Sequence, residues 1–151
     1  MRRATISLLL LIFIFALSLC ASGKNESLDE LKARYDKARI EDRAELAIRI
    51  AQLQLHNADK LYDDGKVDAA RAAVNDVVSY SEKARDAAAH TNKHLKNVEI
   101  DVRKMADKLR DIKRSLAFED QAPVGQAIRQ LEDVRTTLLN QMFPSDDQEK
   151  K

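Results

Sequence analysis

The sequence is poor in residues that interrupt or cross-link a chain. Its 151 residues include three glycines, two prolines and one cysteine, with no tryptophan and 5% aromatic residues. A single cysteine excludes an intrachain disulfide and a multi-cysteine metal site. Gly and Pro are the strongest breakers of secondary structure, and residues 24–64 and 66–122 contain neither. We therefore expect helices well above average length, and the scarcity of aromatic and alternating β-branched residues gives no sign of strands.

Neither sign of charge is in excess. Lys and Arg total 26, and Asp and Glu total 25. Binding to nucleic acid needs a clustered positive surplus, so no nucleic-acid partner is expected. Acidic residues interleave even the most basic stretch, residues 103–114. That pattern predicts the solvated face of a long helix, and a binding patch for anionic lipid or polymer is the alternative.

The longest apolar run lies at the N-terminus. Arg2 and Arg3 precede residues 6–19, which are apolar apart from two serines, and small residues follow at 21–23. This order is typical of a secretory signal peptide. The run is shorter than the roughly 20 residues that a membrane-spanning helix needs. We therefore expect residues 1–23 to be removed and the protein to be exported, to the periplasm or the extracellular medium.

Whether Cys20 is removed or lipidated distinguishes two possible exported forms of the protein. Bacterial lipoproteins carry a small residue before the lipidated cysteine, but Leu19 stands at that position, so ordinary cleavage beyond Ala21 is favoured. The alternative is a lipid-anchored envelope protein, modified at Cys20. A membrane is an expected partner only in that form or if the signal is retained. After ordinary cleavage the chain has no cysteine, and its 24 basic residues face 25 acidic ones.

The first helix is expected over residues 27–64. Ser27 and Glu30 have the spacing of a capping box, and Gly65 suits the left-handed conformation that ends a helix. From residue 44 onward, apolar residues cover much of the circumference, which indicates more than one packing partner. We expect residues 44–62 to bind a protein partner or a second copy of the chain, as a homodimer. The predicted interaction face consists of Leu46, Ile50, Leu53 and Leu61.

Residues 67–116 carry the most regular pattern in the chain. Apolar residues recur at alternating spacings of three and four, and only Ser81 and Thr91 interrupt the series. This heptad pattern predicts left-handed packing against a partner helix. We expect one continuous helix over residues 67–117. A break near residues 90–92, which would give a four-helix up-down bundle, is the alternative.

A shorter third helix is expected to begin near Asp120, an N-cap candidate that precedes Pro123. Its apolar face consists of Val124, Ile128, Leu131, Val134 and Leu138. The predicted fold class is all-α: a long antiparallel helical hairpin with heptad packing plus this third helix, within residues 24–143. Residues 144–151 are expected to be a disordered polar tail.

In the segment NADKLYDDGKVDAARAAV, small and apolar residues flank a glycine at spacings that occur in a known helical repeat. Its Ala58, Leu61, Gly65 and Ala70 resemble the turn of a tetratricopeptide repeat, in which small and aromatic positions straddle a glycine. The resemblance covers one hairpin, and no second copy follows at the repeat length of that family. It implies a helical hairpin and suggests protein binding.

One constellation has the residue types of a metal site. His90 and His94 are four residues apart, so a continuous helix would place them on one face, with Asp86 one turn earlier. Both histidines fall on the solvated side of the heptad pattern. We therefore expect no metal and no cofactor, with a periplasmic metal-binding protein as the alternative.

No catalytic pattern stands out. The sequence has no glycine-rich phosphate loop and no serine at a recognisable spacing from a base. The protein is therefore not expected to be an enzyme. The predicted function is that of an exported helical interaction or structural module.

Overall fold

The computed structural model describes residues 26–144, and within that range it contains helices and no strand. The elements are α2 (Leu28–Lys37), α3 (Ile40–Asp63), α4 (Val67–Thr91), α5 (Leu95–Ser115), the 3₁₀ turn η1 (Phe118–Asp120) and α6 (Gln121–Met142). The all-α class and the antiparallel packing are confirmed. The predicted signal peptide, Cys20 and most of the predicted tail lie outside the described residues.

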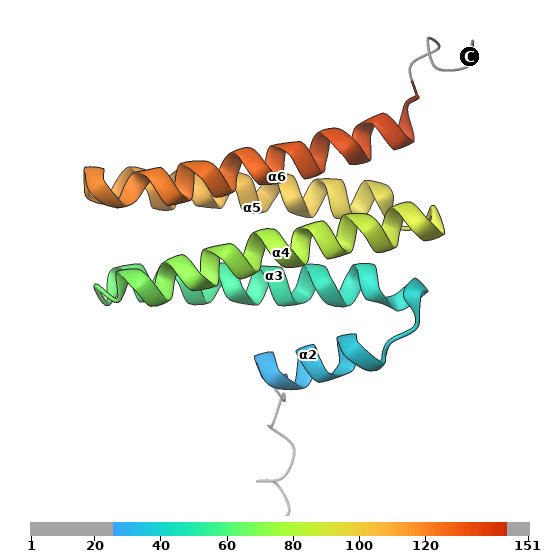
Figure 1. Cartoon of the computed structure of the whole chain (residues 1–151), viewed down its shortest axis with the longest axis horizontal. Helices are drawn as coiled ribbons and strands as arrows, with labels where there is room; N and C mark the ends of the chain where they lie inside the picture. Colours follow the sequence, from blue (N-terminus) through green and yellow to red (C-terminus); the bar gives the residue numbers. More distant parts are fainter. Residues whose placement is uncertain (1–25, 145–151) are drawn as a thin grey trace, which may run out of the picture.

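Four helices form a bundle of two stacked hairpins. Figure 1 shows α3 and α4 as one antiparallel pair and α5 and α6 as a second pair above it. Between the pairs, α4 packs on α6 and α3 packs on α5. The short helix α2 lies on the opposite side of the α3–α4 hairpin from α5 and α6 (Figure 1).

The predicted helix start at Ser27 and helix end at Gly65 are confirmed. Ser27 Oγ accepts a hydrogen bond from the Glu30 amide at 3.2 Å, and the Glu30 carboxylate accepts one from the Ser27 amide at 2.9 Å. At the turn between α3 and α4, Gly65 has a φ of 72°. A side chain is strained in that conformation, so glycine fits this helix end.

The prediction of a single helix over residues 27–64 was wrong. Ala38 and Arg39 are both extended, with ψ of 147° and 156°, and they separate α2 from α3. The extended pair lets α2 fold back onto α3. The wide apolar face of α3 thereby gains a partner within the same chain, which explains why its pattern covers more of the circumference than one hairpin requires.

The continuous helix over residues 67–117 is also not found. Asn92 and His94 have φ of 53° and 63°, and α5 runs back along the bundle from this turn. Thr91 Oγ1 donates to the Ala87 carbonyl at 2.9 Å and accepts from the Lys93 amide at 3.4 Å, so its side chain closes the end of α4. The four-helix alternative is therefore the one observed.

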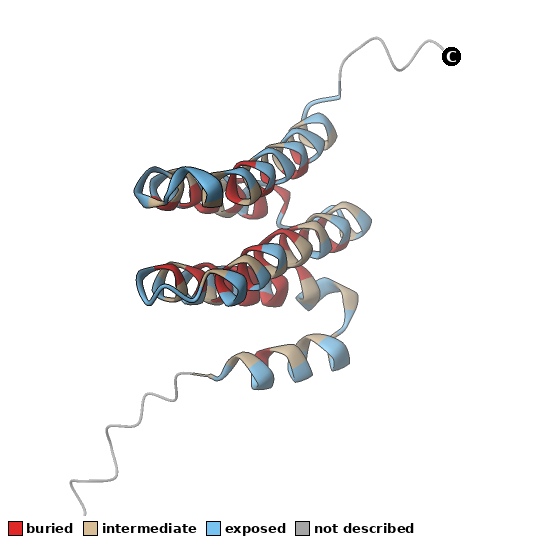
Figure 2. Cartoon of the chain, turned by 60° about the vertical axis from the view of Figure 1, so that its left-hand side comes forward, coloured by how far each residue is buried: buried red, intermediate tan, exposed pale blue. Residues whose placement is uncertain are grey.

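The heptad residues form the core although the helix breaks. All the residues of the series between Ala70 and Ile112 are buried except Thr91, which is half-buried. Buried residues of α3 to α6 form one core cluster, and Figure 2 marks buried stretches in red on the helices of both hairpins. The predicted face of α6 is confirmed, with Leu131 and Leu138 fully buried and Ile128 half-buried.

The start of α6 is as predicted, but its capping differs. Asp120 is the N-cap residue, yet its side chain makes no hydrogen bond to the first turn of α6. Its carboxylate instead accepts a hydrogen bond from the Arg71 guanidinium at 2.7 Å. This ion pair joins α4 to the connection between α5 and α6.

Candidate functional site

The predicted interaction face of α3 lies largely beneath α2. Leu46 is 7% exposed and Ile50 is fully buried, and both pack against Leu31 of α2. Leu53 borders the same cluster and is half-buried, whereas the half-buried Leu61 packs against the main core. A partner can therefore reach Leu46 and Ile50 only after α2 has moved.

Few buried contacts attach α2 to the bundle. Leu31 is its one buried residue, and it belongs to a small cluster separate from the main core. The Tyr35 ring meets the Tyr80 ring of α4 edge to face, with centroids 5.9 Å apart. Burial raises the pKa of both tyrosine hydroxyls, so they remain protonated at neutral pH.

Ion pairs surround this small cluster. Lys32 of α2 contacts Asp76 of α4 at 3.2 Å, and Arg49 of α3 contacts Glu26 at 3.3 Å. Arg34 also pairs with Glu26. The side chains of the Lys32–Asp76 and Arg49–Glu26 pairs are partly exposed, and such pairs contribute about 0–1 kcal/mol each. Burial of one leucine contributes about 1.5–3 kcal/mol, so the docking of α2 is weak compared with the packing of the main core.

A depression of about 440 Å³ separates part of α2 from α3. Leu46 lies at this depression, and the remaining lining is mostly charged. The lining residues are Ala33, Arg34, Lys37, Ala38, Asp42, Glu45, Leu46 and Arg49. An apolar contact surrounded by charge is typical of a protein interface rather than of a catalytic pocket.

The predicted histidine pair does not share a helix. His90 lies in the last turn of α4, and His94 is the N-cap residue of α5, so the turn between them removes the i, i+4 geometry. Both side chains are exposed. Within residues 26–144, no three His, Cys, Asp or Glu side chains lie close enough to bind a metal ion.

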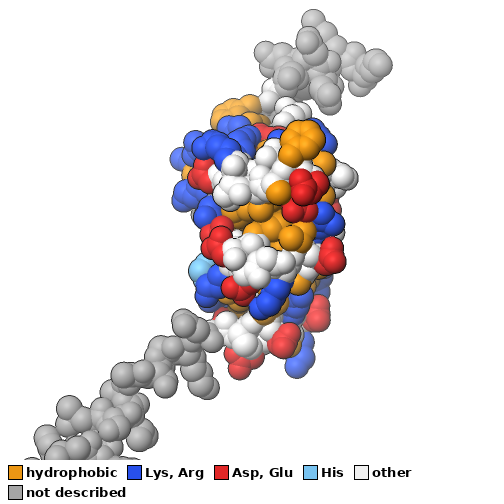
Figure 3. All heavy atoms as spheres, turned by 90° about the vertical axis from the view of Figure 1, so that its left-hand side faces the viewer, with side chains coloured by type: hydrophobic (Ala, Val, Ile, Leu, Met, Phe, Trp, Pro, Cys, Tyr) orange, Lys and Arg blue, Asp and Glu red, His pale blue; other side chains and the backbone are white. Residues whose placement is uncertain are grey.

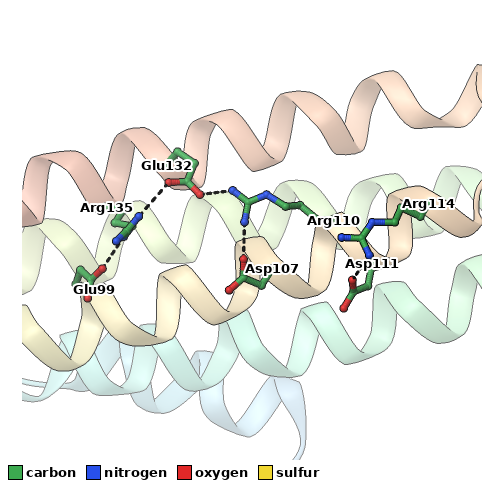
Figure 4. Close-up of polar contacts among 7 residues, drawn as sticks. All are labelled: Glu99, Asp107, Arg110, Asp111, Arg114, Glu132 and Arg135. Carbon is green, nitrogen blue, oxygen red and sulfur yellow. Dashed lines mark hydrogen bonds and ion pairs between the residues drawn. The ribbon is translucent and has the colours of Figure 1, made fainter.

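An ion-pair network links α5 to α6 (Figure 4). Arg135 contacts the nearly buried Glu99 at 2.6 Å and Glu132 at 3.6 Å, and Arg110 contacts both Glu132 and Asp107 at 2.5 Å. The hydrogen bond that Arg135 donates to Glu99 raises the pKa of Arg135, and the one that Arg110 donates to Glu132 raises the pKa of Arg110. The carboxylates therefore stabilise both guanidinium charges and fix the two helices relative to each other.

Most of the basic stretch at 103–114 is paired in the same way. Lys108 contacts Asp59 of α3 at 2.7 Å, and Arg114 contacts Asp111 at 3.1 Å. Arg103 and Lys104 are exposed on α5. These placements agree with the predicted solvated face, apart from Lys113, which points toward α6.

The sequence reasoning missed the residues of α2 that cover α3. Leu31 and Tyr35 fell within the single helix predicted over residues 27–64 and were not expected to cover α3. The signal that would have found them is the wide apolar face from residue 44 onward, because a face of that width needs more partners than one hairpin supplies.

Neither a search for membrane-spanning helices nor a comparison with known proteins assigns a function to this chain. No helix within residues 26–144 is long and apolar enough to span a membrane. No family model, no curated protein and no solved structure matches this chain.

Proposed function

We propose that this protein is an exported helical interaction module whose recognition face is the strip of α3 formed by Leu46, Ile50 and Leu53. The occupant of that strip is an amphipathic helix of the size of α2, supplied by a second copy of the chain. The observation that carries the proposal is that a ten-residue helix with one buried side chain covers the strip.

Exchange of α2 between two copies requires little rearrangement. The connection consists of Ala38 and Arg39, which are already extended, so a change in their direction moves α2 as a unit. The same contacts of Leu31 and Tyr35 then form between copies. Exchange of an identical element is a low-cost route to a dimer, because the interface is already complementary.

The experiment that tests this proposal uses two cysteine variants of the chain from residue 24, which has no other cysteine. Leu31→Cys and Ile50→Cys chains, mixed under mild oxidation, are expected to form a disulfide between the two different chains. The reason is that exchange places position 31 of one copy against position 50 of the other. Non-reducing electrophoresis and mass spectrometry identify this product.

The matched control mixes Ala33→Cys with Gln52→Cys, which place exposed cysteines on the same two helices. If disulfides formed only by random collision between chains, they would form more readily at these exposed positions than at positions 31 and 50. If the 33–52 product forms as readily as the 31–50 product, or if neither heterodimer forms, exchange of α2 does not occur. A different partner protein would then be the remaining occupant.

The export part of the proposal rests on the N-terminal pattern of Arg2, Arg3 and the apolar run at 6–19. Expression of the full chain in an exporting bacterium is expected to yield a protein that begins near residues 22–24, as measured by intact mass. Soluble and membrane fractions are analysed separately. A membrane-bound chain that begins at Cys20 with added acyl mass would establish the lipoprotein alternative instead.

A further inference from the structure

A groove between α5 and α6 has a charge unlike that of the surface around it. One depression of about 400 Å³ and a second of about 420 Å³ share Lys113, Gln121, Gly125 and Arg129 in their linings. The first is also lined by Arg110 and Arg114 and by no carboxylate. The groove lies at the end of the bundle where η1 connects the two helices, far from the strip beneath α2 (Figure 1).

Gly125 keeps the floor of this groove open. It is buried within α6, where glycine costs about 1 kcal/mol relative to alanine. A Cβ atom at this position would meet only the ends of two side chains, Lys113 Nζ at 3.4 Å and a guanidinium nitrogen of Arg129 at 3.8 Å. Core packing therefore does not require glycine here. A side chain larger than alanine here would take up the space in which Lys113 lies across α6.

The two central cations of the groove are not neutralised. Lys113 and Arg129 form no ion pair with any residue in the range 26–144, whereas Arg110 and Arg114 at the rim are paired. The first turn of α6 contains no acidic residue and has no side-chain cap. The positive end of the helix dipole therefore adds to the two unpaired charges.

Apolar surface adjoins these cations. Phe118 is 88% exposed on η1 and lines the second depression, and the half-buried Ile128 lines the first. Figure 3 views this end of the bundle and shows Lys and Arg side chains gathered on one side of its upper half, with hydrophobic side chains exposed nearby. An exposed phenylalanine is uncommon on a free surface and contributes area to interfaces.

We propose that the α5–α6 groove binds an acidic peptide segment of a partner protein. Carboxylates of the segment pair with Lys113 and Arg129, and an adjacent apolar side chain packs on Phe118. The site is separate from the α3 strip, so it goes beyond the function proposed above and does not depend on it.

The distribution of charge favours a narrow segment over an anionic membrane. Glu119 of η1 lines the second depression, and the helices around the groove carry further carboxylates at Asp107, Asp111 and Glu132. A flat anionic surface would meet these carboxylates together with the cations, and their repulsion would offset the attraction. A chain segment that enters the groove meets the unpaired cations first.

The test measures fluorescence anisotropy of a panel of labelled acidic octapeptides, each with one Phe, Leu or Ile, added to the chain from residue 24. Lysine-containing versions of the same peptides are the peptide controls. At least one acidic member is expected to bind, more weakly at 0.5 M than at 0.05 M salt because salt screens the charges. Lys113→Glu/Arg129→Glu is expected to weaken that binding by about tenfold or more, since it reverses both attractions.

Two further variants separate the groove from net charge and from folding. Lys96→Glu/Arg103→Glu makes the same change in charge at exposed positions on α5 outside the groove, and it is expected to change the affinity less than threefold, on the order of a screened surface effect. Gly125→Leu fills the floor without changing charge and is expected to abolish binding. Because leucine favours a helix more than glycine does, circular dichroism should show α6 intact.

Three outcomes would overturn the proposal. The first is that no acidic peptide binds better than its lysine version, and the second is that both charge-reversed variants lose affinity equally. The third is that no peptide binds the protein, whereas vesicles containing 30% phosphatidylglycerol do bind it in a flotation assay. In that outcome the Lys113→Glu/Arg129→Glu variant does not float with the vesicles. That third result would assign the groove to a membrane surface.

Discussion

Replacing Leu131 with alanine is expected to lower the free energy of unfolding by about 3 kcal/mol. Leu131 is fully buried at the middle of α6, within the main core of the bundle. The substitution removes three methyl or methylene equivalents and leaves a cavity that the helices on either side cannot close without moving. Urea denaturation followed by circular dichroism measures the loss.

The control for this prediction is Leu139→Ala, which makes the same change on the same helix. Leu139 is half-buried, so water can occupy part of the vacated space and the expected loss is below about 1 kcal/mol. Equal losses for the two variants would mean that α6 is not packed against the bundle as described.

Replacing both Asn92 and His94 with valine is expected to lower the free energy of unfolding by about 2–4 kcal/mol, since the left-handed conformation costs about 1–2 kcal/mol per residue and valine adopts it less readily than Asn or His. These two residues have positive φ in the turn between α4 and α5. Asparagine tolerates the conformation, whereas β-branched valine does so poorly. Thermal and urea denaturation of the double variant measure the effect.

Lys93→Val is the control, because Lys93 lies between these two residues and does not have a positive φ. It is expected to change the stability by less than about 0.5 kcal/mol. A double variant of unchanged stability but greater length in small-angle X-ray scattering would show that α4 and α5 can join. The sequence would then permit the long hairpin as well as the bundle.

The turn at Asn92–His94 shows why the heptad pattern was not sufficient to predict the fold. A three-and-four spacing specifies which side chains are buried, and nearly all of those from Ala70 to Ile112 are buried. It does not specify that one helix carries them. Thr91 and Leu95 keep the four-residue spacing in the sequence although a turn, and not a helix, lies between them. The break lets each half of the series pack on two helices, since α4 contacts both α3 and α6 and α5 contacts both α6 and α3.

The break at Ala38–Arg39 had a different cause. Neither residue is a helix breaker, and no Gly or Pro lies within residues 24–64. What separates α2 from α3 is the free energy gained when Leu31 covers Leu46 and Ile50. That gain depends on a contact between residues distant in sequence, so local propensity could not reveal it.

For the candidate sites too, some features could be predicted from the sequence and others could not. The leucines of the α3 face were identifiable from their spacing, but that they are covered by α2 of the same chain was not. The basic stretch was identifiable from composition. That Lys113 lies beside Gly125 and Arg129 was not, because these two residues belong to another helix.

The sequence by itself determined the all-α class, the cap at Ser27, the end of α3 at Gly65 and the identity of the buried residues in α4, α5 and α6. These features follow from periodicity and local backbone chemistry, which act over a few residues. Only the tertiary structure decided where the helices break, what covers the α3 strip and which cations remain unpaired. Each of these depends on whether a contact between distant segments offsets the cost of turning the chain.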